Sequence, residues 1–111
     1  MKEYILINRV PANYDRTDAQ KINDAWNITT NKWKADGIFV TSFVFPSEGF
    51  LVSTTDKIVQ NGNVLSDNLK VVSVIVLKAN DYESAVVLAK ECPHFEQSGT
   101  VEIREIMSRP S

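Results

Sequence analysis

The stretch VVSVIVL at residues 71–77 decides how this chain folds. Apart from Ser73 every side chain in it is apolar, so both faces of the corresponding strand are apolar, and most of its residues are β-branched. A strand of this kind belongs at the centre of a sheet that is covered on both sides. The rest of the chain must therefore supply neighbouring strands, helices for one face and a cover for the other.

Four further segments read as strands around this centre. Residues 4–9 form an apolar run near the N-terminus, and residues 100–107 place Val101 and Ile103 in alternation with charged side chains. Residues 38–45 and 50–54 are rich in β-branched and aromatic residues. Only four turn residues separate these last two segments, so we expect them to pair as an antiparallel hairpin.

The segment from residue 57 to residue 70 has the weakest pattern. Asn61-Gly62 is a strong signal for a two-residue turn, and residues 58–59 and 64–65 could form a small ribbon on either side. We interpret Asn61-Gly62 as a structural turn and not as a catalytic group. An asparagine amide takes up no proton near neutral pH and cannot serve as a general base.

The first predicted helix begins at Thr17 or Asp18 and runs to about residue 35, where Asp36-Gly37 ends it. Its apolar positions recur at spacings of three and four, which places them on one face. These positions are Ile22, Ala25, Trp26, Thr29 and Trp33.

The second predicted helix is capped by Asn80 or Asp81, continues to about residue 91 and ends before Pro93. The resulting order is strand, helix, strand pair, strand, helix, strand, and it predicts one α+β domain of β-α-β-β-α-β type over residues 1–111. Right-handed crossovers place both helices on one face of an antiparallel sheet, which is a ferredoxin-like arrangement. The other face then lacks a cover, and a second copy of the sheet is the simplest one, so we expect a homodimer.

Composition argues against several classes of protein. The formal charge is −2, from 12 basic and 14 acidic residues without a basic run, so we expect no nucleic-acid partner. The N-terminal apolar run is too short for a secretion signal and no stretch is long enough to span a membrane, so we expect no membrane partner. The single cysteine, Cys92, cannot form an intrachain disulfide and suits a cytoplasmic location.

Several motifs occur together in an order typical of one family. They are MKEYILI at residues 1–7, Trp26 and Trp33 followed by Gly37, ANDYESA at 79–85, LAK at 88–90, CP at 92–93 and GTVEIR at 99–104. With these motifs the chain resembles the YCII-related proteins, in the branch named for an Asp-Gly-Pro-Phe motif. The resemblance implies a ferredoxin-like domain that dimerises through its sheets into an α+β barrel. Some relatives are lyase-like enzymes acting on small ring compounds.

The chain departs from that family pattern at three places. Asn61-Gly62-Asn63-Val64 stands where the family has Asp-Gly-Pro-Phe, and Val72-Ser73-Val74 stands where many members have Gly-Gly-Phe. Residues 17–26 contain no histidine, although some members carry one early in the first helix. The acid and the base that the resemblance implies are thus missing.

Trp26 and Trp33 are the first candidates for a ligand pocket, because they share the apolar face of the first helix. They could form the aromatic floor of such a pocket. A stripe of this kind more often packs against the sheet as core, and that is the interpretation we favour for both.

Four polar residues are the other pocket candidates. Asp67 and Lys70 are expected in the loop that leads to residues 71–77, where they form either a ligand wall or an ordinary solvated loop. Glu102 and Arg104 are two apart on a strand and point to the same side. They could pair with each other at the dimer seam or meet the carboxylate of a ligand.

His94, the only histidine, lies two residues after Cys92. A thiolate–imidazole pair would be a nucleophile, but we favour a surface-loop histidine beside a small buried thiol. One cysteine and one histidine fall short of a metal site, and no phosphate-binding or dinucleotide-binding motif is present, so we expect no metal and no cofactor.

Together these features predict a homodimeric module that binds a small molecule or a partner protein without catalysis. The alternative is a cofactor-free lyase or isomerase that acts on a small ring compound in a pocket between the sheet and the helices.

Overall fold

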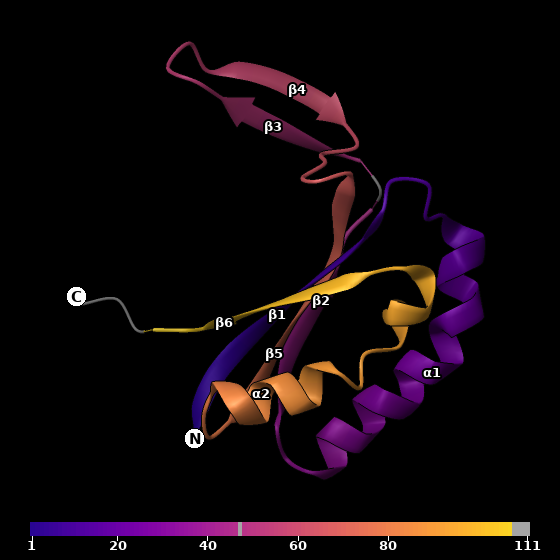
Figure 1. Ribbon diagram of the computed structural model, residues 1–111, viewed down its shortest axis with the longest axis vertical. Helices are drawn as coiled ribbons and strands as arrows, with labels where there is room; N and C mark the ends of the chain where they lie inside the picture. Colours follow the sequence, from indigo (N-terminus) through magenta and orange to yellow (C-terminus); the bar gives the residue numbers. More distant parts are fainter. Residues whose placement is uncertain (47, 108–111) are drawn as a thin grey trace.

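The structure is a computed structural model that describes residues 1–46 and 48–107. Within these residues the chain is mixed α+β, with one four-stranded antiparallel sheet, one two-stranded sheet and two α-helices (Figure 1). The elements in order are β1 (Lys2–Pro11), α1 (Arg16–Ala35), β2 (Phe39–Val44), β3 (Gly49–Ser53), β4 (Ile58–Gly62), β5 (Leu69–Ala79), α2 (Tyr82–Ala89), the short 3-10 helix η1 (Pro93–Gln97) and β6 (Thr100–Glu105).

The larger sheet has the strand order β2-β5-β1-β6, and every neighbouring pair is antiparallel. The predicted central position of residues 71–77 is confirmed, since β5 lies between β1 and β2. Leu6 pairs with Ile75 and Asn8 with Ser73, but Arg9 pairs with Val71. One extra β5 residue, Val72, therefore opposes the junction between Asn8 and Arg9 as a bulge.

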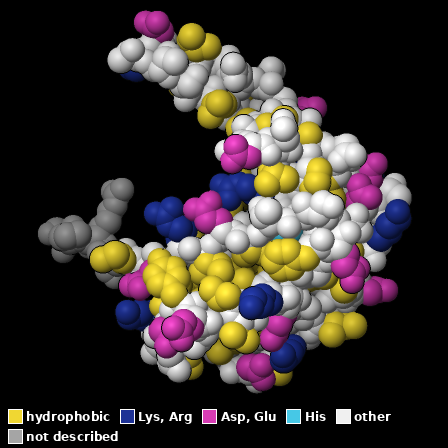
Figure 2. All heavy atoms as spheres, in the orientation of Figure 1, with side chains coloured by type: hydrophobic (Ala, Val, Ile, Leu, Met, Phe, Trp, Pro, Cys, Tyr) yellow, Lys and Arg dark blue, Asp and Glu magenta, His cyan; other side chains and the backbone are white. Residues whose placement is uncertain are grey.

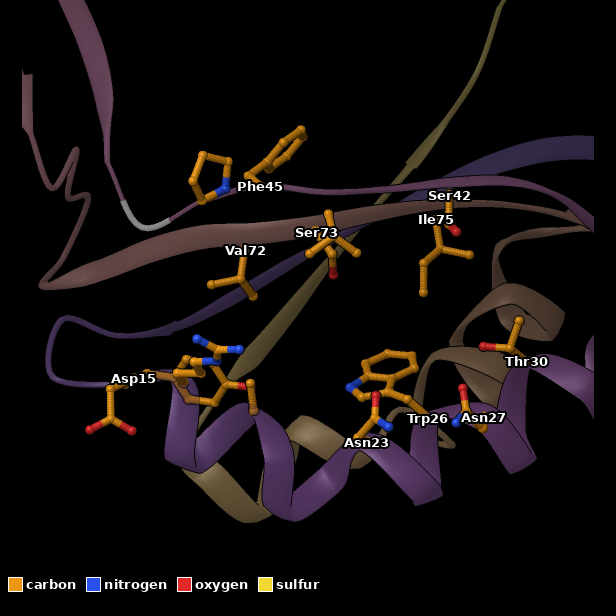
Figure 3. Close-up of a pocket in the computed structure, with 15 residues that line it drawn as sticks. Asp15, Asn23, Trp26, Asn27, Thr30, Ser42, Phe45, Val72, Ser73 and Ile75 are labelled. Atoms are coloured by element: carbon orange, nitrogen blue, oxygen red, sulfur yellow. The ribbon is translucent and has the colours of Figure 1, made fainter.

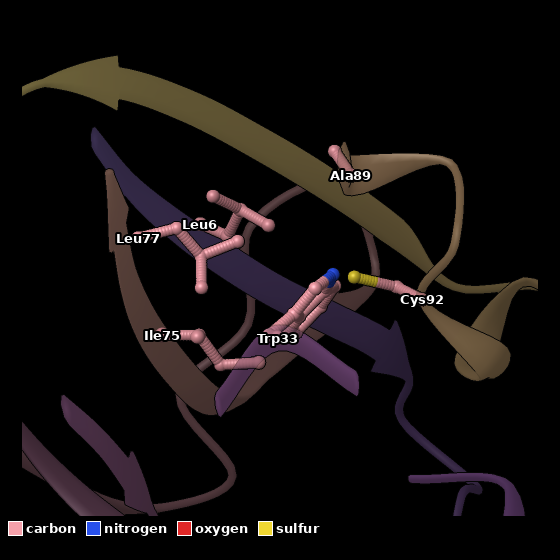
Figure 4. Close-up of a cluster of buried hydrophobic side chains, with 6 residues drawn as sticks. All are labelled: Leu6, Trp33, Ile75, Leu77, Ala89 and Cys92. Atoms are coloured by element: carbon pink, nitrogen blue, oxygen red, sulfur yellow. The ribbon is translucent and has the colours of Figure 1, made fainter. Parts of the chain in front are cut away.

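Both helices cover the same face of this sheet, as predicted. Leu6 on β1 and Leu77 on β5 point toward the helices and pack with Trp33 of α1 and Ala89 of α2 (Figure 4). The side chains of Leu6 and Trp33 are fully buried. Burying a large apolar side chain contributes about 1.5–3 kcal/mol, so this cluster anchors both helices to the sheet.

The helices begin at aspartate caps. The carboxylate of Asp15 accepts the backbone N–H of Asp18, and the carboxylate of Asp18 accepts that of Asp15, so α1 begins slightly earlier than predicted. Asp18 lies inside the helix because it completes this capping box. The helix α2 is capped by Asp81, one of the two predicted residues. Among the described residues no helix is long and apolar enough to cross a membrane.

The predicted hairpin between residues 38–45 and 50–54 is wrong. The strand β2 pairs with β5, through Ser42 opposite Ile75 and Phe43 opposite Val74. The strand β3 pairs with β4 instead. The long apolar β5 offers β2 a complete partner inside the sheet, whereas β3 and β4 are consecutive and close on each other locally.

The predicted turn at Asn61-Gly62 is also wrong. Both residues lie in β4, where Asn61 pairs with Phe50 and Gly62 with Gly49, and the ribbon with residues 64–65 does not form. The chain reverses at residues 54–57, where the amide of Lys57 donates to the carbonyl of Thr54 over 3.1 Å. Five successive cross-strand pairs between β3 and β4 outweigh the local preference of Asn-Gly for a turn.

The face of the large sheet away from the helices is called the open face below. It carries Ile5 and Ile7 of β1 beside Val74 and Val76 of β5, with the pairs Ile7–Val74 and Ile5–Val76 directly opposite each other. All four side chains are partly exposed, whereas their neighbours on the helix side of β1 are buried. This face is therefore apolar and only partly shielded within one chain.

Candidate functional site

A cleft of about 530 Å³ separates α1, from Arg16 to Thr30, from the helix-side face of β2 and β5 (Figure 3). Its walls combine one indole, several hydroxyl and amide side chains, and apolar groups. The residues lining it are Tyr14, Asp15, Arg16, Ala19, Asn23, Trp26, Asn27, Thr30, Ser42, Val44, Phe45, Pro46, Val72, Ser73 and Ile75. A volume of this size suits a small-molecule ligand.

Trp26 is the aromatic wall of the cleft. It is half-buried and projects from α1 toward β5, where Ser73 and Ile75 face it (Figure 3). Its ring stacks on that of His94, with centroids 5.8 Å apart and an interplanar angle of 11°. This stacking fixes the plane of the indole, so that a flat ligand would meet a preset surface.

Trp33 takes no part in the cleft. Its side chain is fully buried, and its Nε1 donates to Oε2 of Glu91 over 3.0 Å. The two tryptophans, which sequence reasoning treated alike, thus have different roles. The expectation of a core residue is confirmed for Trp33. Trp26 packs against the edge of the same core cluster and also lines the cleft.

A buried asparagine positions one hydroxyl of the cleft. The side chain of Asn8 is fully buried and its Nδ2 donates to Oγ of Ser73 over 2.9 Å. Because this bond uses a lone pair of Oγ, the hydroxyl proton of Ser73 remains available to an acceptor in the cleft. Sequence reasoning missed both residues, although Ser73 was the one polar position in VVSVIVL.

Only two of the lining residues carry a charge, and they have opposite signs. Asp15 and Arg16 lie at the N-terminal end of α1. The carboxylate of Asp15 points away from the cleft (Figure 3) and accepts the backbone N–H of Asp18, a hydrogen bond that lowers the pKa of this carboxyl. A carboxylate held in this way is a weak general base.

His94 is not a surface residue, which corrects the expectation. It is 1% exposed, its ring is stacked with those of Trp26 and Phe95, and its Nε2 donates to the carbonyl of Thr100 over 2.9 Å. That bond leaves Nδ1 unprotonated and buried, without a partner among the described residues. Burial lowers the pKa of His94, so the imidazole is neutral near pH 7.

Cys92 is a free, buried thiol, as expected. It packs in the core cluster beside Trp33 (Figure 4). Burial raises the pKa of this thiol to about 12. A thiol with such a pKa is protonated near neutrality and is a poor nucleophile.

Asp67 and Lys70 do not line the cleft of Trp26. Asp67 and Asn68 form a two-residue turn in which both φ angles are positive, between Ser66 and Leu69. Lys70 does not lie in a loop as expected: it belongs to β5 and is buried, and its Nζ donates to the carbonyl of Tyr14 over 2.9 Å. Lys70 therefore ties β5 to the segment before α1.

Glu102 and Arg104 lie on β6 and point to the open face, away from the cleft. Their side chains pair over 3.2 Å, which confirms that they share one side of the strand. Glu102 also accepts a hydrogen bond from Arg9 over 2.7 Å, and that bond lowers the pKa of the Glu102 carboxyl. These three residues form a charged border beside the apolar part of the open face.

No three His, Cys, Asp or Glu side chains come together as a metal site within residues 1–46 and 48–107. No family model matches this sequence, and no curated protein matches it either.

Proposed function

We propose that this chain is a YCII-related domain of ferredoxin-like type that works as a homodimer and binds a small ring compound between α1 and the sheet. The strand order β2-β5-β1-β6 supports the ferredoxin-like assignment. With β3 and β4 set aside as an insertion, the remaining strands and helices follow the β-α-β-β-α-β order, and both helices lie on one face.

The cleft of Trp26 is the observation that carries the binding proposal. An indole held by stacking on His94 offers one face to a flat ring. The hydroxyl of Ser73 and the amides of Asn23 and Asn27 can orient polar substituents of that ring. The one carboxylate among the lining residues, that of Asp15, points away from the cleft, so no acidic group there would attract a cationic ligand.

Binding is favoured over catalysis by the state of the groups near the cleft. The imidazole of His94 lies behind Trp26 and is engaged with Thr100. The carboxylate of Asp15 caps α1 and points away from the cleft. A lyase or isomerase needs a positioned acid or base within reach of its substrate, and neither residue is placed for that work.

The open face supports the homodimer. Four partly exposed aliphatic side chains on β1 and β5 lie next to one another there as cross-strand pairs. Phe43 of β2, which is 57% exposed, lies beside them. A contiguous apolar face of this kind marks an interface. A second copy presents the same flat apolar surface, and a two-fold axis can bring the two together.

Ligand-detected NMR with benzamide and phenol tests the binding proposal. We expect saturation transfer from the protein to both compounds at millimolar concentration. Ala19→Phe, which fills the cleft, should abolish it. Ala25→Phe, on the same helix but outside the cleft, should leave it unchanged. Equal transfer in both variants would place binding elsewhere and contradict the proposal.

A further inference from the structure

The strands β3 and β4 form an arm that stands apart from the large sheet. They pair only with each other, and the arm projects beyond the body of the molecule (Figure 1). A two-stranded hairpin on its own is marginally stable in water at best. The arm therefore needs a surface to pack against.

The register of the arm separates its two faces. Val52 and Val59 are directly opposite each other, and Phe50 lies on the same side two residues before Val52. Their exposed fractions are 73% for Phe50 and 60% for each valine. This side of the arm therefore exposes three apolar side chains to solvent beside one polar residue, Asn61, which pairs with Phe50. It is called the arm face below.

The arm and the body border a common hollow. The space-filling view shows the surface hollowed between the projecting arm and the rest of the molecule (Figure 2). The chain enters the arm from β2 and leaves it toward β5, two neighbouring strands of the sheet that carries the open face. An exposed apolar arm and an exposed apolar sheet face thus occur in one chain.

We propose that the arm face of each copy packs on the body of a second copy, so that two chains clasp each other. This inference rests on the proposed homodimer and extends its interface beyond the sheets. Every copy supplies both an arm and a body, so a two-fold axis forms two identical arm contacts at once. A formal charge of −2 per chain opposes such an association only weakly.

Light scattering and sedimentation on three single variants test this clasp. Val52→Asp lies on the arm face, Val74→Asp on the open face, and Val87→Asp is a control on α2, where Val87 is 62% exposed. We expect dimeric wild-type protein, a dimer dissociation constant raised at least about tenfold by Val52→Asp, and no change with Val87→Asp. An unchanged constant in Val52→Asp, together with dissociation in Val74→Asp, would overturn the clasp and leave the sheet dimer intact. Monomeric wild-type protein would overturn both.

A photo-crosslinker at position 50 provides a second test of the clasp. It reports contact between the arm and the body directly and requires no dissociation constant. Phe50→p-benzoylphenylalanine preserves an aromatic arm face, and mixing isotope-labelled with unlabelled protein separates contacts between copies from contacts within one. We expect crosslinks from position 50 to peptides of the body of the other copy. Crosslinks only within one chain, or only from arm to arm, would overturn the clasp.

Discussion

The indole of Trp33 and the carboxylate of Glu91 are joined by a hydrogen bond of 3.0 Å across 58 residues of sequence. Trp33 lies near the end of α1, and Glu91 follows α2, so this bond ties the ends of the two helices together over the sheet. The same carboxylate forms an exposed ion pair with Lys32 through its other oxygen, at 3.0 Å.

Removing the acceptor from this bond should cost more than removing the ion pair. Glu91→Ala leaves the buried indole N–H without its partner, for which we expect a loss of about 1–3 kcal/mol in unfolding free energy. Glu91→Gln keeps an acceptor and should cost less, and Lys32→Ala, which removes an exposed pair, should cost at most about 1 kcal/mol. Urea denaturation measures all three. A Lys32→Ala loss as large as that of Glu91→Ala would show that the ion pair dominates.

Gly99 is required by close packing against the buried histidine. A Cβ at this position would overlap Cδ2 of His94 and lie 2.7 Å from the carbonyl oxygen of Arg9. We therefore expect Gly99→Ala to destabilise the fold by about 1–3 kcal/mol. Gly49→Ala is the control, because its nearest contact would be Cγ2 of Val64 at an ordinary 3.8 Å. Equal melting temperatures for the two variants would contradict this account of the His94 environment.

The buried imidazole of His94 should make stability depend on pH just below neutrality. Its pKa is lowered by burial, whereas an unfolded chain has a histidine pKa of about 6.5. The unfolded state therefore binds a proton first as the pH falls, so the contribution of His94 to stability declines below about pH 6.5 and is level above about pH 7.5. NMR titration of the His94 ring reads this pKa directly. A value at or above that of the unfolded chain would refute the prediction.

The thiol of Cys92 should react slowly in the folded protein. It is 3% exposed, and burial raises its pKa to about 12. A disulfide reagent should label it at a rate set by opening of the structure, and urea should accelerate the reaction sharply. Fast labelling below about pH 8 in native buffer would indicate an accessible thiolate instead.

Patterns that depend on neighbouring residues were readable from the sequence. The apolar run at 71–77 identified the central strand, and the spacing of Ile22, Trp26 and Trp33 identified a helix facing the sheet. Both signals arise because a helix or strand that is buried on one or two faces carries apolar residues at regular positions in the sequence. The same reasoning placed Glu102 and Arg104 on one side of β6.

Features that depend on distant contacts were not readable. The partner of β2 is β5, and the local Asn-Gly signal concealed the longer pairing of β3 with β4. The burial of His94 arises from stacking on Trp26 and from the small Gly99, which a scan of the segment after Cys92 cannot reveal. The bond from Asn8 to Ser73 spans 65 residues and leaves no local pattern.

Ligand binding at Trp26 is the central claim, and the two tryptophans of the chain provide a direct test. A proton–nitrogen correlation spectrum shows one indole N–H signal for Trp26 in the cleft and one for Trp33 in the core. When benzamide is added to millimolar concentration, we predict that the Trp26 signal shifts and saturates while the Trp33 signal stays in place. A Trp26 signal that does not move, or equal movement of both signals, would contradict the account.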